Sequence, residues 1–182
     1  MPQMVSSRAP GEERSDEVQT QQAYLQLARW IKNLAGPVCG LSPIRPDSPF
    51  PSVSVNLARA LASLGSSMGI IVPERDWQDG SADSQPIIKA LSDGVDSITP
   101  IRLRFGVSPT LERVLAAVRG RYSQVLLDLS GLDIVRVTEV ALLPEVKIVL
   151  LMTPGSTNEF ALARLRRRLP PERLLGAVFV DR

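Results

Sequence analysis

The residues from Val38 to Val53, VCGLSPIRPDSPFPSV, decide the fold and frame the question of function. A short apolar segment runs into a turn-rich loop, and the loop opens a predicted helix over Val53–Leu64. This is the setting in which G-x-x-x-x-G-K-[ST] binds the phosphates of a nucleotide. The second glycine, the lysine and the first hydroxyl of that motif fall on Pro49, Phe50 and Pro51. The order of strand, loop and helix therefore predicts a nucleoside triphosphatase fold, whereas Pro49, Phe50 and Pro51 argue against nucleotide chemistry.

Phosphate binding in such a loop needs converging backbone N–H groups, glycines with positive φ and a lysine that offsets charge. Proline has no N–H group, so Pro49 and Pro51 each remove a donor. The sequence has no lysine from Asn33 to Ile88, and only Ser52 remains to supply the hydroxyl that meets magnesium. We therefore expect no bound cofactor, no metal and no catalytic residue. The plainer interpretation, an ordinary proline-rich connection, stays open from this loop alone.

Composition sets the remaining bounds. A chain of 182 residues with a net charge of +2 is typical of one globular domain and not of a general nucleic-acid binder. The sequence contains no histidine, which excludes histidine-based triads and metal sites within it. A single cysteine, Cys39, allows no internal disulfide, and no apolar run approaches the roughly 20 residues that span a bilayer. A cytoplasmic protein is the resulting expectation.

The chain divides into three predicted parts. Residues 1–16 are polar and without periodicity, which is typical of a disordered leader. Residues 17–35 form an N-terminal helix that Gly36-Pro37 ends, and residues 36–182 form an α/β domain. Its strands are expected at Val38–Leu41, Met68–Val72, Ser97–Leu103, Val125–Leu129, Lys147–Met152 and Ala177–Val180. Its helices are expected at Val53–Leu64, Ile87–Leu91, Pro109–Arg119 (with Ser108 as N-cap) and Thr157–Leu169. Continuous apolar strands separated by helices predict a single domain with a mainly parallel sheet covered on both faces.

Acidic residues follow two of these strands. Asp128 ends the apolar run that begins at Val125, and Glu74 and Asp76 follow the strand that begins at Met68. Acids at the carboxyl ends of parallel strands face the crevice where such sheets bind ligands and magnesium. The alternatives are that Glu74 and Asp76 are solvated surface acids, and that Asp128 accepts hydrogen bonds from the turn at Ser130-Gly131.

The predicted helix near the C-terminus is strongly basic. It carries Arg164, Arg166, Arg167 and Arg168, and Arg173 follows it. Such a run meets phosphates, anionic lipid or an acidic partner, or it is simply a solvated face. No aromatic residue interleaves with the arginines, so a stacking nucleic-acid site is not supported.

Taken in order, these pieces resemble the cytoplasmic ATPase domain of bacterial tyrosine kinases (BY-kinases), which belong to the MinD/ParA-like group of deviant P-loop ATPases. The resemblance extends from about Gln21 to Arg182. Its most specific match is Ser54–Ala62, SVNLARALA, to the A-A-N-L-A-x-A-L-A helix after the phosphate loop. Gln22–Leu27 is similar to the N-terminal Glu-Ala-aromatic helix of the family. Ser108-Pro109 and Arg121–Asp128 resemble its S-P and R-Y-D-x-V-I-I-D segments.

The departures fall on catalytic positions. Pro49, Phe50 and Pro51 replace the Gly-Lys-Ser of the phosphate loop, and Glu74 replaces the first acid of the second motif. The D-x-P-P of the third motif becomes Asp128-Leu129-Ser130-Gly131. Only Ser52, Asp76 and Asp128 match magnesium-site positions of the family. The resemblance thus implies a P-loop NTPase fold that has lost its reaction: a pseudokinase acting as an interaction or regulatory module in exopolysaccharide synthesis or export.

The implied partner is an inner-membrane polysaccharide chain-length or export protein, which would recruit the chain to that membrane. Relatives in this group often dimerise across the nucleotide, and self-association of this chain stays open. Two other hypotheses remain. One is an unorthodox ATPase or tyrosine kinase in which Arg45 substitutes for the lysine. The other is a ParA-like DNA-associated partner that uses Arg164, Arg167 and Arg168.

Overall fold

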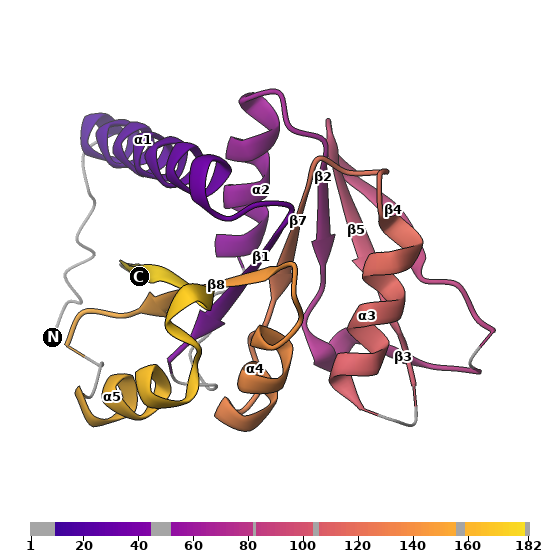
Figure 1. Ribbon diagram of the computed structural model, residues 1–182. Coiled ribbons are helices and arrows are strands. Elements are labelled where there is room, and N and C mark those ends of the chain that lie inside the picture. The colour runs from indigo at the N-terminus through magenta and orange to yellow at the C-terminus, as the bar shows by residue number, and fades with distance from the viewer. Residues whose placement is uncertain (1–9, 45–51, 82, 104–105, 156–158, 181–182) are drawn as a thin grey trace, which may run out of the picture.

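A computed structural model of the chain describes residues 10–44, 52–81, 83–103, 106–155 and 159–180. Among these residues, seven strands form one sheet in the order β4-β5-β2-β7-β1-β8-β9 (Figure 1). All neighbours are parallel except the antiparallel pair β4 and β5. The strands are β1 (Val38–Pro43), β2 (Met68–Ile71), β4 (Ile87–Ser92), β5 (Val95–Thr99), β7 (Gln124–Asp128), β8 (Val146–Met152) and β9 (Leu174–Phe179). Two short strands, β3 (Gln78–Asp79) and β6 (Ile101–Arg102), pair separately.

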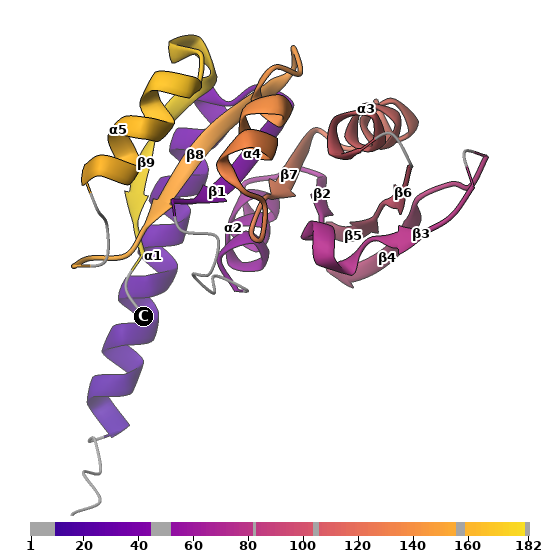
Figure 2. The ribbon, with the colours of Figure 1, turned by 90° about the horizontal axis from the view of Figure 1, so that it is seen from below.

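Helices cover both faces of the sheet (Figures 1 and 2). One face packs against α1 (Pro10–Leu34) and α2 (Val53–Ser63). The opposite face packs against α3 (Val107–Val118), α4 (Ile134–Ala141) and α5 (Glu159–Arg168). Two 3₁₀ turns, η1 (Glu74–Asp76) and η2 (Pro171–Arg173), complete the described elements. The predicted α/β class, with a mainly parallel sheet covered on both faces, is confirmed.

The two-sided core explains why the strands are apolar throughout. Successive side chains of a strand point to opposite faces, so Leu126 of β7 packs with α1 and α2 while Leu127 packs with α3 and α4. Both leucines are fully buried. Gly40 lies in the middle of β1, where an added Cβ would come within 2.7 Å of Ile148 and 2.9 Å of Leu129. Glycine at this position therefore lets the layers on the α3–α5 side close over the central strand.

The segment Ile87–Leu91 was predicted as a short helix, and this is wrong. It belongs to β4, which pairs antiparallel with β5 through a hairpin at Asp93-Gly94. Gly94 has φ of 72°, which suits such a turn. An apolar run this short does not specify a helix by itself, and the Asp-Gly turn with the pairing to β5 decides it.

Two helix starts differ from expectation, and one helix was not predicted. The first helix begins at Pro10, so part of the predicted leader is helical; residues 1–9 lie outside the described part of the chain. The N-cap of α3 is Gly106 and not Ser108. The helix α4 was not anticipated, and Asp133 caps it by accepting hydrogen bonds from the backbone N–H groups of Val135 and Arg136. A helix this short gives little periodic signal, so its cap is the clearest mark in the sequence.

Candidate functional site

The carboxyl ends of β1, β2 and β7 meet the start of α2 at one edge of the sheet. The register places Leu41 of β1 beside Asp128 of β7, and the chain then leaves β1 toward α2. Parallel sheets bind their ligands at this edge, next to the first residues of the following helices. The fold thus places the end of β1, the start of α2 and Asp128 at one edge of the sheet.

Asp128 is engaged on both carboxylate oxygens. Its Oδ2 accepts a hydrogen bond from Ser54 Oγ at 2.8 Å. Its Oδ1 accepts from the backbone N of Ser130 at 3.0 Å and from Ser130 Oγ at 2.6 Å. The carboxylate therefore joins the end of β7 to the first turn of α2 and also closes the turn that follows it. The same oxygens would be the ones available to a magnesium ion.

The hydroxyl that reaches Asp128 is that of Ser54, whereas Ser52, the residue predicted at the magnesium position, lies two residues earlier. Ser52 is the N-cap residue of α2, is exposed, and makes no capping hydrogen bond through its side chain. Ser54 is 4% exposed and belongs to the buried face of α2. A serine that interrupts the apolar face of a helix opposite an acidic strand end was the signal for this contact.

The acids after β2 separate in space. Glu74 in η1 forms an ion pair with Arg136 of α4, with 2.5 Å between Oε2 and Nη1. Its side chain is 15% exposed, and its backbone carbonyl also accepts a hydrogen bond from Arg102. Asp76 is half-exposed and lies 3.8 Å from Arg75. Glu74 therefore braces the loop after β2 against α4, while Asp76 remains near the surface.

A small hollow of about 180 Å³ brings Asp76 and Asp128 together. Ser54 and Arg75 also line it, whereas Glu74 does not. Its volume is below the roughly 300–1,000 Å³ of ordinary small-molecule sites. In the described part of the chain, no group of three or more acidic or cysteine side chains is arranged to hold a metal ion.

Positive charge at this edge does not come from lysine. The lysines of the sequence are Lys32, Lys89 and Lys147. Lys32 donates to the carbonyl of Leu64 and Lys147 to the carbonyl of Glu172, while Lys89 is exposed on β4. The other loop predictions fall on Arg45, Pro49, Phe50 and Pro51, which lie outside the described residues.

Two further reactive groups lie away from this edge. Burial raises the pKa of the Cys39 thiol to about 12, so it is not a thiolate nucleophile at neutral pH. Burial and a hydrogen bond to Asp96 raise the pKa of Tyr122 to about 12. Tyr122 precedes β7 and so lies at the opposite end of that strand from Asp128.

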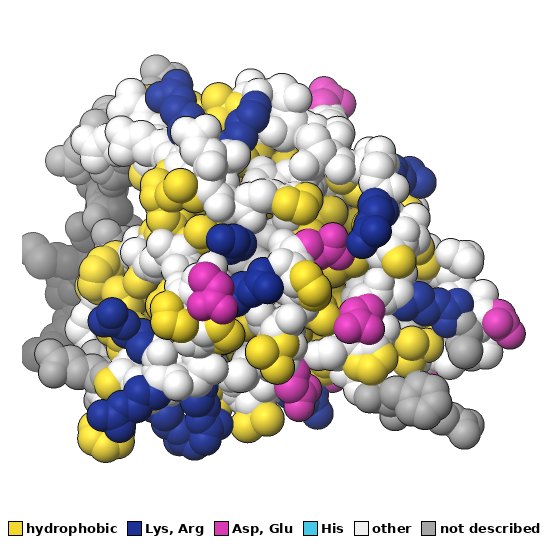
Figure 3. Space-filling view, viewed as in Figure 1, with side chains coloured by type: hydrophobic (Ala, Val, Ile, Leu, Met, Phe, Trp, Pro, Cys, Tyr) yellow, Lys and Arg dark blue, Asp and Glu magenta, His cyan; other side chains and the backbone are white. Residues whose placement is uncertain are grey.

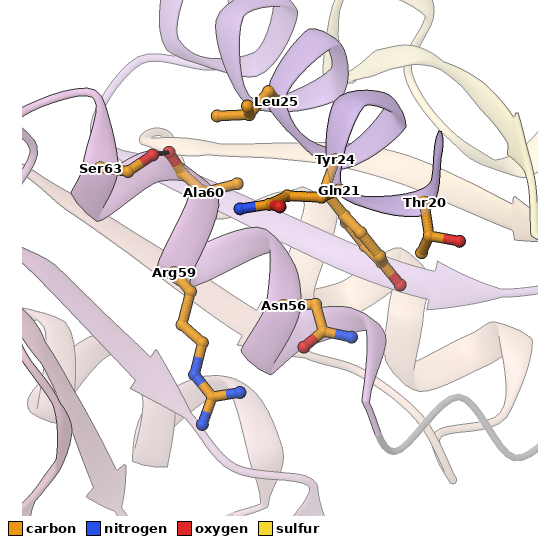
Figure 4. A pocket seen from close by; sticks show the side chains of 8 residues that line it. All are labelled: Thr20, Gln21, Tyr24, Leu25, Asn56, Arg59, Ala60 and Ser63. Carbon is orange, nitrogen blue, oxygen red and sulfur yellow. Dashed lines mark hydrogen bonds between the residues drawn. The ribbon is translucent and has the colours of Figure 1, made fainter. Parts of the chain in front are cut away.

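A wider cavity of about 790 Å³ opens between α1 and α2 (Figure 4). Tyr24 from α1 and Asn56 from α2 point into it from facing helices. Arg59 and Gln21 also line it, and the lining includes no acidic side chain. This cavity offers amide, hydroxyl, phenol and guanidinium groups but, among the described residues that line it, no carboxylate to act as a general base.

No family model and no curated protein matches the sequence. Solved structures do match the fold. The BceF tyrosine kinase domain superposes with a TM-score of 0.66 at 18% identity, over 88% of this chain and 76% of that one. The kinase domain of VpsO gives 0.65 at 15% identity, over 96% of this chain and 100% of that one.

The fold is that of the bacterial tyrosine kinase domains. The chimerical protein CapA2B2 agrees, with a TM-score of 0.62 at 15% identity over 88% of this chain and 81% of that one. The bacterial tyrosine kinase fold is thus confirmed for this chain as predicted from its sequence, and at these identities the likeness concerns the fold alone. No helix in the described part of the chain is both long and apolar enough to cross a membrane.

Proposed function

We propose that this chain is a non-catalytic module with the bacterial tyrosine kinase fold, which acts by binding other proteins. The observation that carries the proposal is the state of Asp128. Its carboxylate is occupied by Ser54 and Ser130 at the edge where a nucleotide would bind. The sequence between β1 and α2 contains no lysine and has prolines where N–H donors are required.

A magnesium nucleotide does not fit the charges at this edge. An NTP needs cationic groups and free N–H donors for its phosphates, and magnesium needs oxygen ligands that are not otherwise engaged. Glu74 is held by Arg136, and the hollow that Asp76 and Asp128 line is smaller than a nucleotide site. At this edge of the sheet, the acidic side chains Asp128 and Glu74 thus bind other residues of the chain, which supports a role without nucleotide.

The proposed setting is bacterial exopolysaccharide synthesis or export. It follows from the resemblance to bacterial tyrosine kinases and from the fold shared with the BceF and VpsO kinase domains. The proposed partner is an inner-membrane polysaccharide chain-length or export protein, which would bring the chain to the membrane surface. In this role the fold would supply a binding surface, and no phosphate would be transferred.

Isothermal titration with ATP and ADP in the presence of magnesium tests the proposal. We expect no heat of binding at nucleotide concentrations up to the millimolar range, about three orders of magnitude above a micromolar site. Micromolar affinity for ATP or ADP would overturn the proposed non-catalytic function. Phosphate release from ATP that Asp128→Asn abolishes would instead establish the unorthodox enzyme, because Asp128 is the acid best placed to meet magnesium.

A further inference from the structure

The exposed face of α5 gathers positive charge. Arg164 and Arg167 lie on the same face as Phe160 and Ala163, because residues three, four and seven apart are neighbours on a helix. Together with Arg168 these side chains surround a hollow of about 220 Å³. Figure 3 shows the Lys and Arg side chains gathered over α5 at the lower left of the molecule. The Phe160 side chain is 81% exposed.

These arginines are not neutralised locally. No ion pair joins Arg164, Arg167 or Arg168 to an acidic side chain in the described part of the chain. By contrast, Arg136 on the neighbouring helix is paired with Glu74. Exposed arginines alone are compatible with a solvated face, so the charge by itself does not define a site.

A second, apolar hollow adjoins the first. It has a volume of about 380 Å³ and shares Phe160 and Arg164 with the basic hollow. Its apolar lining comes from the end of β1, from α4 and from α5, and consists of Pro43, Ile44, Leu132, Ile134, Val137 and Leu165. One acid, Asp133, lines it as well, and its carboxylate is fixed by the backbone at the start of α4.

The two hollows form one groove, which we define by Ile44, Phe160, Arg164, Arg167 and Arg168. The groove is apolar at one end and basic at the other. Asp133 lines only the apolar hollow, and Arg167 and Arg168 line only the basic one. An occupant must therefore combine an apolar side chain with negative charge that continues in one direction from it.

We propose that this groove binds an acidic segment of a partner protein. A bulky apolar side chain of that segment enters the hollow beside Ile44 and Phe160, and the following carboxylates pair with the guanidinium groups of α5. Arginine holds carboxylates through two parallel hydrogen bonds, which gives such pairing geometric specificity. The inference rests on the proposed interaction role and names the surface and the partner chemistry.

The geometry favours a protein segment over a membrane or a nucleic acid. A bilayer surface is flat on this scale and does not fill a recessed apolar hollow, and Asp133 would face its anionic headgroups. Single-stranded nucleic acid binds through several stacked aromatic side chains along a basic groove, whereas Phe160 is the single aromatic side chain among the described residues that line this groove.

Fluorescence anisotropy with the full chain and short labelled peptides tests the proposal. The probe is Glu-Glu-Trp-Glu-Glu, with Glu-Glu-Ser-Glu-Glu and Lys-Lys-Trp-Lys-Lys as comparisons. We expect the first peptide to bind at least about tenfold more tightly than either comparison, since only it satisfies both hollows. Equal binding of the first two peptides would overturn the apolar part of the proposal, and failure of all three would overturn the whole.

A matched pair of variants separates the groove from general charge. Arg167→Glu changes a groove residue, and Arg166→Glu makes the same charge change on an exposed residue of the same helix that lines neither hollow. We expect Arg167→Glu to weaken binding about tenfold or more, and Arg166→Glu to weaken it only about twofold. Phe160→Ala should also weaken the tryptophan peptide but leave the serine peptide unchanged. Equal losses for both arginine variants would overturn the groove.

Two control ligands decide between sources of negative charge. Vesicles rich in phosphatidylglycerol or a single-stranded oligonucleotide, bound in an Arg167-dependent way when the acidic peptide is not, would overturn the proposal in favour of lipid or nucleic acid. Nucleotide titration distinguishes this failure from that of the proposed function. If the peptides do not bind and ATP does not bind either, only the proposed groove is overturned. If ATP binds, the non-catalytic role is overturned, and the peptide experiments still test the groove.

Discussion

The carboxylate at the end of β7 and the arginines of α5 lie near the same edge of the sheet but behave in opposite ways. Asp128 accepts hydrogen bonds from Ser54 and Ser130 and is directed into the molecule. Arg164 and Arg167 form no ion pair among the described residues and are directed outward. In a phosphate-binding protein the interior edge would carry the charges that meet a ligand. Here a group of arginines that form no ion pair among the described residues lies on the outer helix.

This contrast assigns Asp128 to the stability of the fold and the α5 arginines to the binding of a partner. Groups that are satisfied within the fold contribute to the free energy of unfolding, because their partners are left unpaired when they are removed. Charges without internal partners contribute little to it and are free to meet a partner. Matched substitutions at the end of β7 and on α5 test this contrast, and the largest change in stability is expected at Asp128.

Asp128→Ala should destabilise the protein by about 1–3 kcal/mol, since it leaves the buried hydroxyl of Ser54 without its acceptor. Urea unfolding measures the change. Asp76→Ala is the matched control, because that carboxylate is half-exposed and its ion pair with Arg75 is long at 3.8 Å. We expect the control to change stability by less than about 0.5 kcal/mol. Equal effects would show that Asp128 is not a structural anchor.

The pair Glu74 and Arg136 should contribute less than Asp128. Its 2.5 Å contact is strong in geometry, but the Arg136 side chain is 47% exposed and solvent weakens the interaction. A double-mutant cycle with Glu74→Gln and Arg136→Met should give a coupling energy of about 0.5–1 kcal/mol. A coupling of zero would mean that η1 and α4 are not braced by this pair.

Acid should weaken the cap of α4. The backbone N–H of Arg136, with that of Val135, holds the pKa of Asp133 below its ordinary value. A carboxyl with a lowered pKa stabilises the fold above its unfolded-state pKa, roughly 3.9, and this contribution is lost as the pH falls through the folded value. Unfolding curves from neutral pH to below that value should therefore show a smaller loss for Asp133→Asn than for the natural chain. Parallel curves would contradict the role of the ionised cap.

Charge reversal on α5 should have the smallest effect on stability. Arg167→Glu and Arg166→Glu should each change the free energy of unfolding by less than about 0.5 kcal/mol, because neither guanidinium forms an ion pair with a residue that the structure describes. Thermal unfolding followed by circular dichroism measures this. A larger loss for Arg167→Glu alone would indicate a structural role that competes with the proposed binding role.

Sequence reasoning was most successful where the signal was local or continuous. The buried strands at Met68, Val125 and Lys147 were found from apolar runs, and α2 was found from its periodicity and its resemblance to bacterial tyrosine kinases. The helix predicted at Ile87 failed, because an apolar run of that length fits either a strand or a helix. Asp93-Gly94 was the available signal for the hairpin, and it was not used.

The site was only partly predictable. Asp128 was placed at the correct edge because the carboxyl ends of parallel strands meet there. Motif spacing predicted Ser52 at a magnesium position, while the contact of Ser54 to Asp128 depends on which side of α2 faces β7. The pairing of Glu74 with Arg136 was not anticipated, since it joins two elements that are 62 residues apart.

The sequence by itself determined the parallel α/β class, the strand that ends in Asp128 and the absence of lysine between β1 and α2. These properties depend on residue type and on order along the chain. Only the tertiary structure decided that Ser54 satisfies Asp128, that Glu74 braces α4, and that α5 forms a groove with β1 and α4. These contacts depend on how the helices pack against the sheet, and packing brings together side chains whose spacing in the sequence carries no signal.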